Sequence, residues 1–146
     1  MKTIAYVIGN NDYFEGAQLK CAVNDATGIA AIFRRLGYDV IEKLNFKSKE
    51  CPEILTSFED KIKYYDASIF YYAGHGFELE GENYLIPIDY QIPPINKYEA
   101  GRYCLKLTEI LGILKKNSGK VNIWKNAIDC EAYRYDEIIR EEERIK

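Results

Sequence analysis

The single histidine of the chain, His75, lies between two glycines in the segment YYAGHGFELEG, residues 71–81. Histidine titrates near neutral pH, so it is the side chain best suited to exchange a proton with a reacting group. The flanking glycines allow a sharp backbone turn and let a substrate approach the imidazole closely. The N–H of Gly76 is also a candidate donor to a developing oxyanion. We therefore interpret the segment as a candidate catalytic loop with His75 as the base.

A cysteine is a natural partner for such a base, because cysteine reacts as the thiolate and the base removes its proton. Cys130 follows His75 by 55 residues and comes shortly after the apolar, β-prone segment VNIW at 121–124. The alternative is that His75 only ends a strand and that Cys130 is a small buried hydrophobic residue. Residue types and spacing leave both interpretations open.

The elements that would position these residues follow from the hydrophobic pattern. Apolar runs rich in β-branched and aromatic residues predict strands at 3–9, 38–46, 66–74 and 119–124. Apolar residues at helical spacing predict helices at 24–36, 52–65 and 105–116. Asn24 or Asp25 is expected to cap the first helix. Two further segments are expected to form a short extended piece of a hairpin and a charged helix or tail, at 82–90 and 135–146.

This alternation of strands and helices predicts the fold class. It is typical of an α/β three-layer sandwich with a mostly parallel sheet and helices on both faces. Ligands of such sheets bind at the carboxyl ends of the strands. His75 comes at the carboxyl end of the third predicted strand and Cys130 just beyond the fourth. The topology is therefore expected to bring both residues to one edge of the sheet.

Composition excludes several classes of protein. The 146 residues are enough for about one domain, and a net charge of −3 with a pI of about 5.3 gives no basic footprint for nucleic acid. We see neither a signal peptide nor an apolar run long enough to cross a membrane. The four cysteines are scattered, and one histidine cannot complete a zinc finger. We therefore expect a cytoplasmic protein with reduced thiols, no metal and no cofactor.

Four segments carry a second line of argument. They are YVIGNNDY at 6–13, AVNDATGIAAIFRRLGYDV at 22–40, SIFYYAGHGFELEGENYLIPID at 68–89, and VNIW with IDC between 121 and 130. Together they resemble the caspase-like domain of clan CD cysteine peptidases, the peptidase C14 family, and in particular its bacterial metacaspase-like and paracaspase-like members. A histidine about 50 residues before the cysteine is also the spacing found in caspases. The resemblance runs from residue 3 to about 130.

The resemblance implies roles for five residues. His75 would be the general base, Cys130 the nucleophile, and the amides of Gly76 and Cys130 the oxyanion donors. Asp25 would line a substrate pocket for an Arg or Lys side chain, with Asp129 as a second acid. The implied activity is that of a cysteine endopeptidase that cleaves a protein or peptide substrate after Arg or Lys, because a carboxylate in that pocket would pair with the substrate cation. No calcium-loop pattern is present, so no metal is assigned.

The end of the chain departs from the family pattern. In WKNAIDCEAYR, residues 124–134, an Asp directly precedes the cysteine instead of standing two residues before it, and Lys125 and Asn126 replace aliphatic residues. We expect a large-subunit-like caspase domain over 1–135 and a charged tail or helix over 136–146. A second chain or a small-subunit segment would then cover the sheet edge. The alternatives left open are a catalytically impaired scaffold or interaction fragment and, with weaker support, a nucleotide-binding α/β domain that lacks the usual glycine-rich loop.

Overall fold

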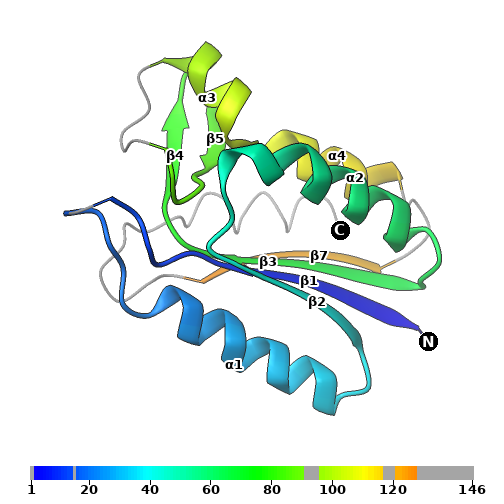
Figure 1. Ribbon diagram of the computed structural model, residues 1–146. Helices are drawn as coiled ribbons and strands as arrows, with labels where there is room; N and C mark the ends of the chain where they lie inside the picture. Colours follow the sequence, from blue (N-terminus) through cyan, green and yellow to red (C-terminus); the bar gives the residue numbers. More distant parts are fainter. Residues whose placement is uncertain (1, 15, 91–95, 117–120, 128–146) are drawn as a thin grey trace.

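The computed structural model describes residues 2–14, 16–90, 96–116 and 121–127, the last of these as backbone only (Figure 1). Its main sheet consists of four parallel strands in the order β2-β1-β3-β7. Their bounds are Thr3–Gly9 for β1, Asp39–Leu44 for β2, Ala67–Ala73 for β3 and Val121–Ala127 for β7. The expected parallel sheet is confirmed.

Helices cover both faces of this sheet, as predicted. Helix α1 lies on one face, and helices α2 and α4 lie side by side on the other (Figure 1). Their bounds are Ala22–Arg35 for α1, Cys51–Ile62 for α2 and Leu107–Lys116 for α4. A 3₁₀ turn, η1 (Ser48–Glu50), leads into α2.

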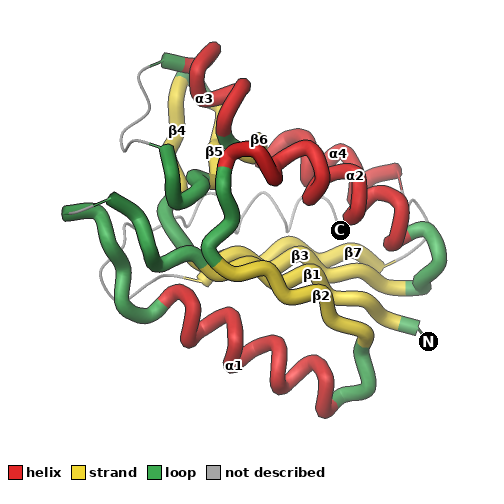
Figure 2. The backbone as a smooth tube through the Cα atoms, viewed as in Figure 1, coloured by secondary structure: helices red, strands yellow, loops and turns green. Residues whose placement is uncertain are grey.

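A second, smaller sheet stands at the carboxyl end of the main one (Figure 2). Its antiparallel strands have the order β4-β5-β6, with bounds Gly76–Leu79, Glu82–Leu85 and Leu105–Lys106. The short helix α3 (Lys97–Tyr103) lies beside it. The expected hairpin piece is therefore β5, paired with the strand that begins at Gly76. The predicted tail and the boundary at 135 lie outside the described residues.

The two core layers explain why β1 and β3 are central. All seven residues of β1 are buried, and so are all but one of the residues of β3. Side chains alternate between the two faces of a strand. The face toward α2 and α4 carries large residues, among them Tyr6, Phe70 and Tyr72. The face toward α1 carries smaller residues such as Ala5 and Val7, and α1 meets it with Ala26 and Ala30, so the helix packs close to the sheet.

Three features of the helices differ from the sequence prediction. Helix α1 begins at Ala22, so Asp25 lies within its first turn and the expected cap at Asn24 or Asp25 is wrong. The reason is tertiary: the side-chain carbonyl of Asn11 accepts a hydrogen bond from the Val23 N–H at 2.9 Å, which satisfies a first-turn donor from outside the helix. Helix α4 starts after residues 105–106, because these pair with β5. Helix α3, capped by the Asn96 side chain, was not predicted.

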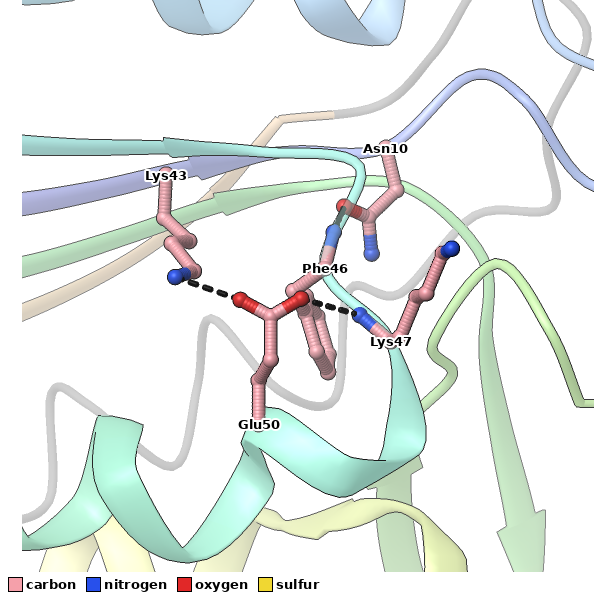
Figure 3. Close-up of polar contacts among 5 residues, drawn as sticks. All are labelled: Asn10, Lys43, Phe46, Lys47 and Glu50. Carbon is pink, nitrogen blue, oxygen red and sulfur yellow. Dashed lines mark hydrogen bonds and ion pairs between the residues drawn. The ribbon is translucent and has the colours of Figure 1, made fainter.

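An ion pair fixes the connection from β2 to α2. Lys43 of β2 contacts one carboxylate oxygen of Glu50, and the other oxygen accepts the Lys47 N–H at 3.1 Å (Figure 3). Hydrogen bonding between Lys43 and Glu50 lowers the pKa of the Glu50 carboxyl and raises the pKa of the Lys43 amine. Both side chains are about a quarter to a third exposed, so the pair is only partly screened by solvent.

We expect Glu50→Gln to lower the free energy of unfolding by about 0.5–1 kcal/mol at pH 7, because glutamine keeps an acceptor for Lys47 but loses the charge. A carboxyl whose pKa is lowered by folding stabilises the fold above its unfolded pKa, and that stabilisation disappears as the pH falls through the folded value. Urea unfolding at pH 7 and pH 3 should therefore show a difference at pH 7 only. Glu59→Gln, which breaks the more exposed pair with Lys116, is the control with a smaller effect. An equal loss at both pH values would contradict the assignment.

Candidate active site

One buried asparagine holds together the loops at the carboxyl edge of the main sheet. Asn10 follows β1 and is fully buried. Its N–H donates to the Ala73 carbonyl at 2.9 Å. Its side-chain oxygen accepts the Phe46 N–H at 3.1 Å (Figure 3). Its side-chain amide donates to the Ile86 carbonyl at 3.2 Å. Asn10 thus fixes the ends of β1 and β3, the start of the segment after β2, and the residue that follows β5.

His75 lies at this edge, two residues beyond the end of β3, and is only 7% exposed. Its Nε2 is 2.7 Å from the Ala17 carbonyl oxygen, and its ring packs against the Tyr13 ring with a centroid separation of 4.5 Å. A carbonyl oxygen only accepts hydrogen bonds, so Nε2 carries the hydrogen in the neutral imidazole. The other nitrogen, Nδ1, is buried and has no hydrogen-bond partner among the described residues. That nitrogen is consequently the one with a lone pair free to take up a proton.

Gly76 and Gly74 flank the imidazole with different tasks. Gly76 begins β4 and stands opposite Leu85 of β5, so it anchors the small sheet directly beside His75. A Cβ atom at Gly74 would come within 2.6 Å of the Tyr72 hydroxyl and 2.9 Å of the Tyr13 hydroxyl. Glycine at 74 is therefore required by the close approach of these two side chains.

Asp25 lies on the α1 side of the sheet, half-buried in the first turn of α1. Tyr71 of β3 is near it: burial, together with the negative charge of Asp25, raises the pKa of the Tyr71 hydroxyl to about 12. Tyr71 packs between the core layer under α1 and the cluster around Tyr13 and Ala73. The structure therefore places Asp25 and the histidine loop at the same end of β3.

The cysteines divide into three groups. Cys51 and Cys104 are free and buried, and burial raises the pKa of both thiols, that of Cys51 to about 12. Such thiols stay protonated at neutral pH, so neither is suited to act as a nucleophile. Cys21 is disulfide-bonded, so the expectation of reduced thiols throughout is wrong there. Cys130 and Asp129, the expected nucleophile and second acid, lie outside the described residues.

Two absences concern the described part of the chain. Across residues 2–14, 16–90 and 96–116, no group of three or more acidic, cysteine or histidine side chains is arranged to hold a metal ion. In the same part of the chain, no helix is long and apolar enough to cross a membrane.

The strand order and the position of the buried histidine together define the class of protein. A parallel sheet is covered by helices on both faces, and it carries a buried histidine at the carboxyl end of β3 with one ring nitrogen held and the other open. This is the arrangement of a caspase-like α/β domain.

Comparison with known proteins gives the family. The model of the caspase domain, Peptidase C14, matches residues 2–115, and the chain belongs to this family. Two curated relatives are mucosa-associated lymphoid tissue lymphoma translocation protein 1 from human and its mouse homologue. Each is 27% identical to the chain over 139 residues, which are 93% of the chain but 16% of the relative. The chain therefore spans about a sixth of the length of these relatives.

Solved structures support the same fold. A protein from Geobacter sulfurreducens matches with a TM-score of 0.66 and 16% identity, over 100% of this chain and 62% of that one. The Drosophila initiator caspase Dronc matches with a TM-score of 0.67 and 11% identity, over 90% of this chain and 50% of that one. At these identities the likeness is one of fold alone.

Several residues of the site were not predicted from the sequence. The segment NNDY at 10–13 reads as a polar loop, yet Asn10 and Tyr13 are buried and contact the histidine loop directly or through Ile86. The group that binds the imidazole at residue 17 is the backbone carbonyl of Ala17, so the residue type gives no sign of this contact. The one available signal was that two residues with polar groups, Asn10 and Tyr13, closely follow a buried strand. Such groups need hydrogen-bond partners when they are buried.

Proposed function

We propose that this chain is a cysteine endopeptidase of the caspase type, in which His75 removes the proton of the Cys130 thiol. The observation that carries the proposal is the buried Nδ1 of His75, which has no partner among the described residues while Nε2 is held by Ala17. A base needs an open lone pair and a fixed ring, and this site offers both. Membership of the caspase-domain family supports the same chemistry.

The register of the sheet also supports the pairing of these two residues. Ala127, the last residue of β7, is paired with Ala73 at the end of β3. His75 follows Ala73 by two residues, and Cys130 follows Ala127 by three. Three residues of extended chain span at most about 10 Å. The short distance along the chain is compatible with a dyad across the two adjacent strand ends.

In this proposal the remaining expected residues keep the roles that the family resemblance implies. The N–H groups of Gly76 and Cys130 would stabilise the oxyanion formed when the thiolate attacks the scissile carbonyl, and the protonated His75 would then donate to the leaving amine. Asp25, with Asp129 as a second acid, would pair with the cation of an Arg or Lys residue before the cleaved bond. Tyr71, which lies near Asp25, would form part of the same pocket.

A partner for the sheet edge belongs to the same proposal. In the described part of the chain β7 pairs only with β3, so its other edge can receive a further strand. We expect that strand to come from a second chain or from a small-subunit segment. The proposed domain covers residues 1–135, followed by a charged tail at 136–146, and a cytoplasmic location is part of the proposal.

We expect the reduced protein to cleave fluorogenic peptides with Arg or Lys before the scissile bond, and not those with Asp, and Cys130→Ala to abolish this cleavage. The same thiol should react with iodoacetamide faster than the buried thiols of Cys51 and Cys104, because a base beside it raises the thiolate fraction. Mass spectrometry of the folded, reduced protein gives the rate at each site. Alkylation of Cys130 at the rate of Cys51, with no cleavage of any peptide, would favour the alternative of a non-catalytic scaffold.

A further inference from the structure

Two tyrosine hydroxyls, from Tyr13 and Tyr72, hold the backbone of His75. The Tyr13 oxygen accepts the His75 N–H at 2.9 Å, and the Tyr72 hydroxyl donates to the His75 carbonyl at 2.6 Å. The two oxygens are 3.2 Å apart, and both side chains are buried, at 3% and 1% exposure. We name Tyr13 and Tyr72 the tyrosine pair.

Counting hydrogens assigns the direction of each bond. A hydroxyl has one hydrogen to donate and oxygen lone pairs to accept with. The Tyr72 hydrogen is used on the His75 carbonyl, and the Tyr13 hydrogen on the Ile86 carbonyl at 2.8 Å. Tyr13 can therefore accept the His75 N–H while it donates to Ile86. It links the histidine loop to the segment after β5 through one atom.

The two members of the pair are not equivalent. The His75 carbonyl has a second donor, the Ile86 N–H at 3.0 Å, so the loss of the Tyr72 hydroxyl leaves it satisfied. The contacts described for the His75 N–H include only the Tyr13 oxygen. The Tyr13 ring also packs edge-on against the imidazole, at an interplanar angle of 65°. Tyr13 therefore restrains both the backbone and the ring of the base.

The contacts of Tyr13 limit the conformational freedom that two glycines give to the histidine loop. Glycines at 74 and 76 give the histidine loop more conformational freedom than any other residues would, and a mobile base loses catalytic effect. The loop between β1 and α1 supplies Tyr13 and, four residues later, the Ala17 carbonyl that holds Nε2. One loop thus contacts both the backbone and the imidazole ring of His75.

We propose that Tyr13 is a positioning residue for His75, which keeps Nε2 on the Ala17 carbonyl and so leaves Nδ1 open. The inference concerns the orientation of the imidazole, and its kinetic consequence rests on the proposed peptidase function. Tyr72 also restrains His75 but contributes less, because the Ile86 N–H donates to the same His75 carbonyl as the Tyr72 hydroxyl.

The experiment compares Tyr13→Phe with Tyr6→Phe. Tyr6 is a buried tyrosine of β1 on the α2 side, and its hydroxyl bonds Ser57, so Tyr6→Phe removes a buried hydroxyl away from the histidine loop. His75 is the single histidine, so nitrogen-15 NMR observes its ring without ambiguity. We expect the Nε2 proton to exchange with solvent at least about ten times faster in Tyr13→Phe, and at the wild-type rate in Tyr6→Phe. Peptide cleavage should show kcat lowered about ten- to a hundred-fold with KM little changed.

The outcomes separate positioning from mere stability. Unchanged Nε2 exchange in folded Tyr13→Phe, or equal acceleration in Tyr6→Phe, overturns the proposal. If wild-type protein cleaves no peptide, the proposed function fails, but the NMR comparison still decides the positioning role. If Tyr13→Phe does not fold, Tyr72→Phe replaces it, with an expected acceleration of about two- to five-fold. The absence of any acceleration in Tyr72→Phe would then count against the proposal.

Discussion

Replacing His75 by glutamine is expected to lower peptide cleavage at least about a thousand-fold, as removal of a base does in related acyl-transfer sites. Glutamine can still donate a hydrogen bond to the Ala17 carbonyl, the partner of Nε2 in the wild type. It has no group that accepts a proton near neutral pH, so the thiol would stay protonated. The loss should appear in kcat, because in the proposed mechanism the imidazole acts on the thiol and on the leaving amine and contributes little to substrate binding.

Two controls make this result specific. The melting temperature of His75→Gln should lie within a few degrees of the wild type, which shows that the loop at the end of β3 is intact. Iodoacetamide should also react more slowly with Cys130 in this variant, because the base no longer raises the thiolate fraction. Cleavage within about tenfold of the wild type would show that His75 is not the base.

The largest expected effect on stability is that of Gly9→Ala, at the end of β1. A Cβ atom at Gly9 would come within 2.6 Å of the Ala26 Cβ, 2.9 Å of the Ala22 carbonyl oxygen and 3.1 Å of the Val23 Cα. The obstacles are the backbone and the shortest side chain of α1, so no flexible side chain can move aside. Overpacking a core typically costs about 1–3 kcal/mol, and this variant should lie at the upper end, about 3 kcal/mol, because no neighbouring atom can move aside. For a domain of this size the melting temperature should fall by roughly 10 °C.

Gly28→Ala is the matched control, on the helix α1 against which Gly9 packs. A Cβ atom at Gly28 meets nothing within 4 Å. Alanine has the higher helix propensity, so this variant should gain up to about 1 kcal/mol. Thermal unfolding of the two variants should therefore change in opposite directions. A loss of stability in both, or in neither, would mean that the first turn of α1 does not lie against β1 in this way.

The sequence determined most of the fold by local pattern. The continuous apolar runs at 3–9 and 66–74 could only be buried between two layers of helices, and they form the two central strands β1 and β3. The helices at 24–36, 52–65 and 105–116 were predicted with shifts of a few residues at their ends. Those shifts have a tertiary cause: α1 is capped by Asn11 from another segment, and residues 105–106 join β5.

The same contrast holds for the site. His75 between two glycines at the end of a buried strand was visible in the sequence. The histidine indicates a group able to exchange protons, and the glycines indicate a sharp turn after the strand. The groups that orient it were not visible. The Ala17 carbonyl belongs to the backbone, and Tyr13 reaches the imidazole only because β1 and β3 are neighbours in the sheet.

Residue types and their spacing thus determined the fold class, the family and the candidate base, since each depends on patterns within a few neighbouring residues. Only the tertiary structure decided which imidazole nitrogen is open, why Gly74 must be glycine and which loop holds the imidazole of His75. These features depend on contacts between segments some 60 residues apart, and hydrophobic periodicity carries no information about the partner of an individual polar atom.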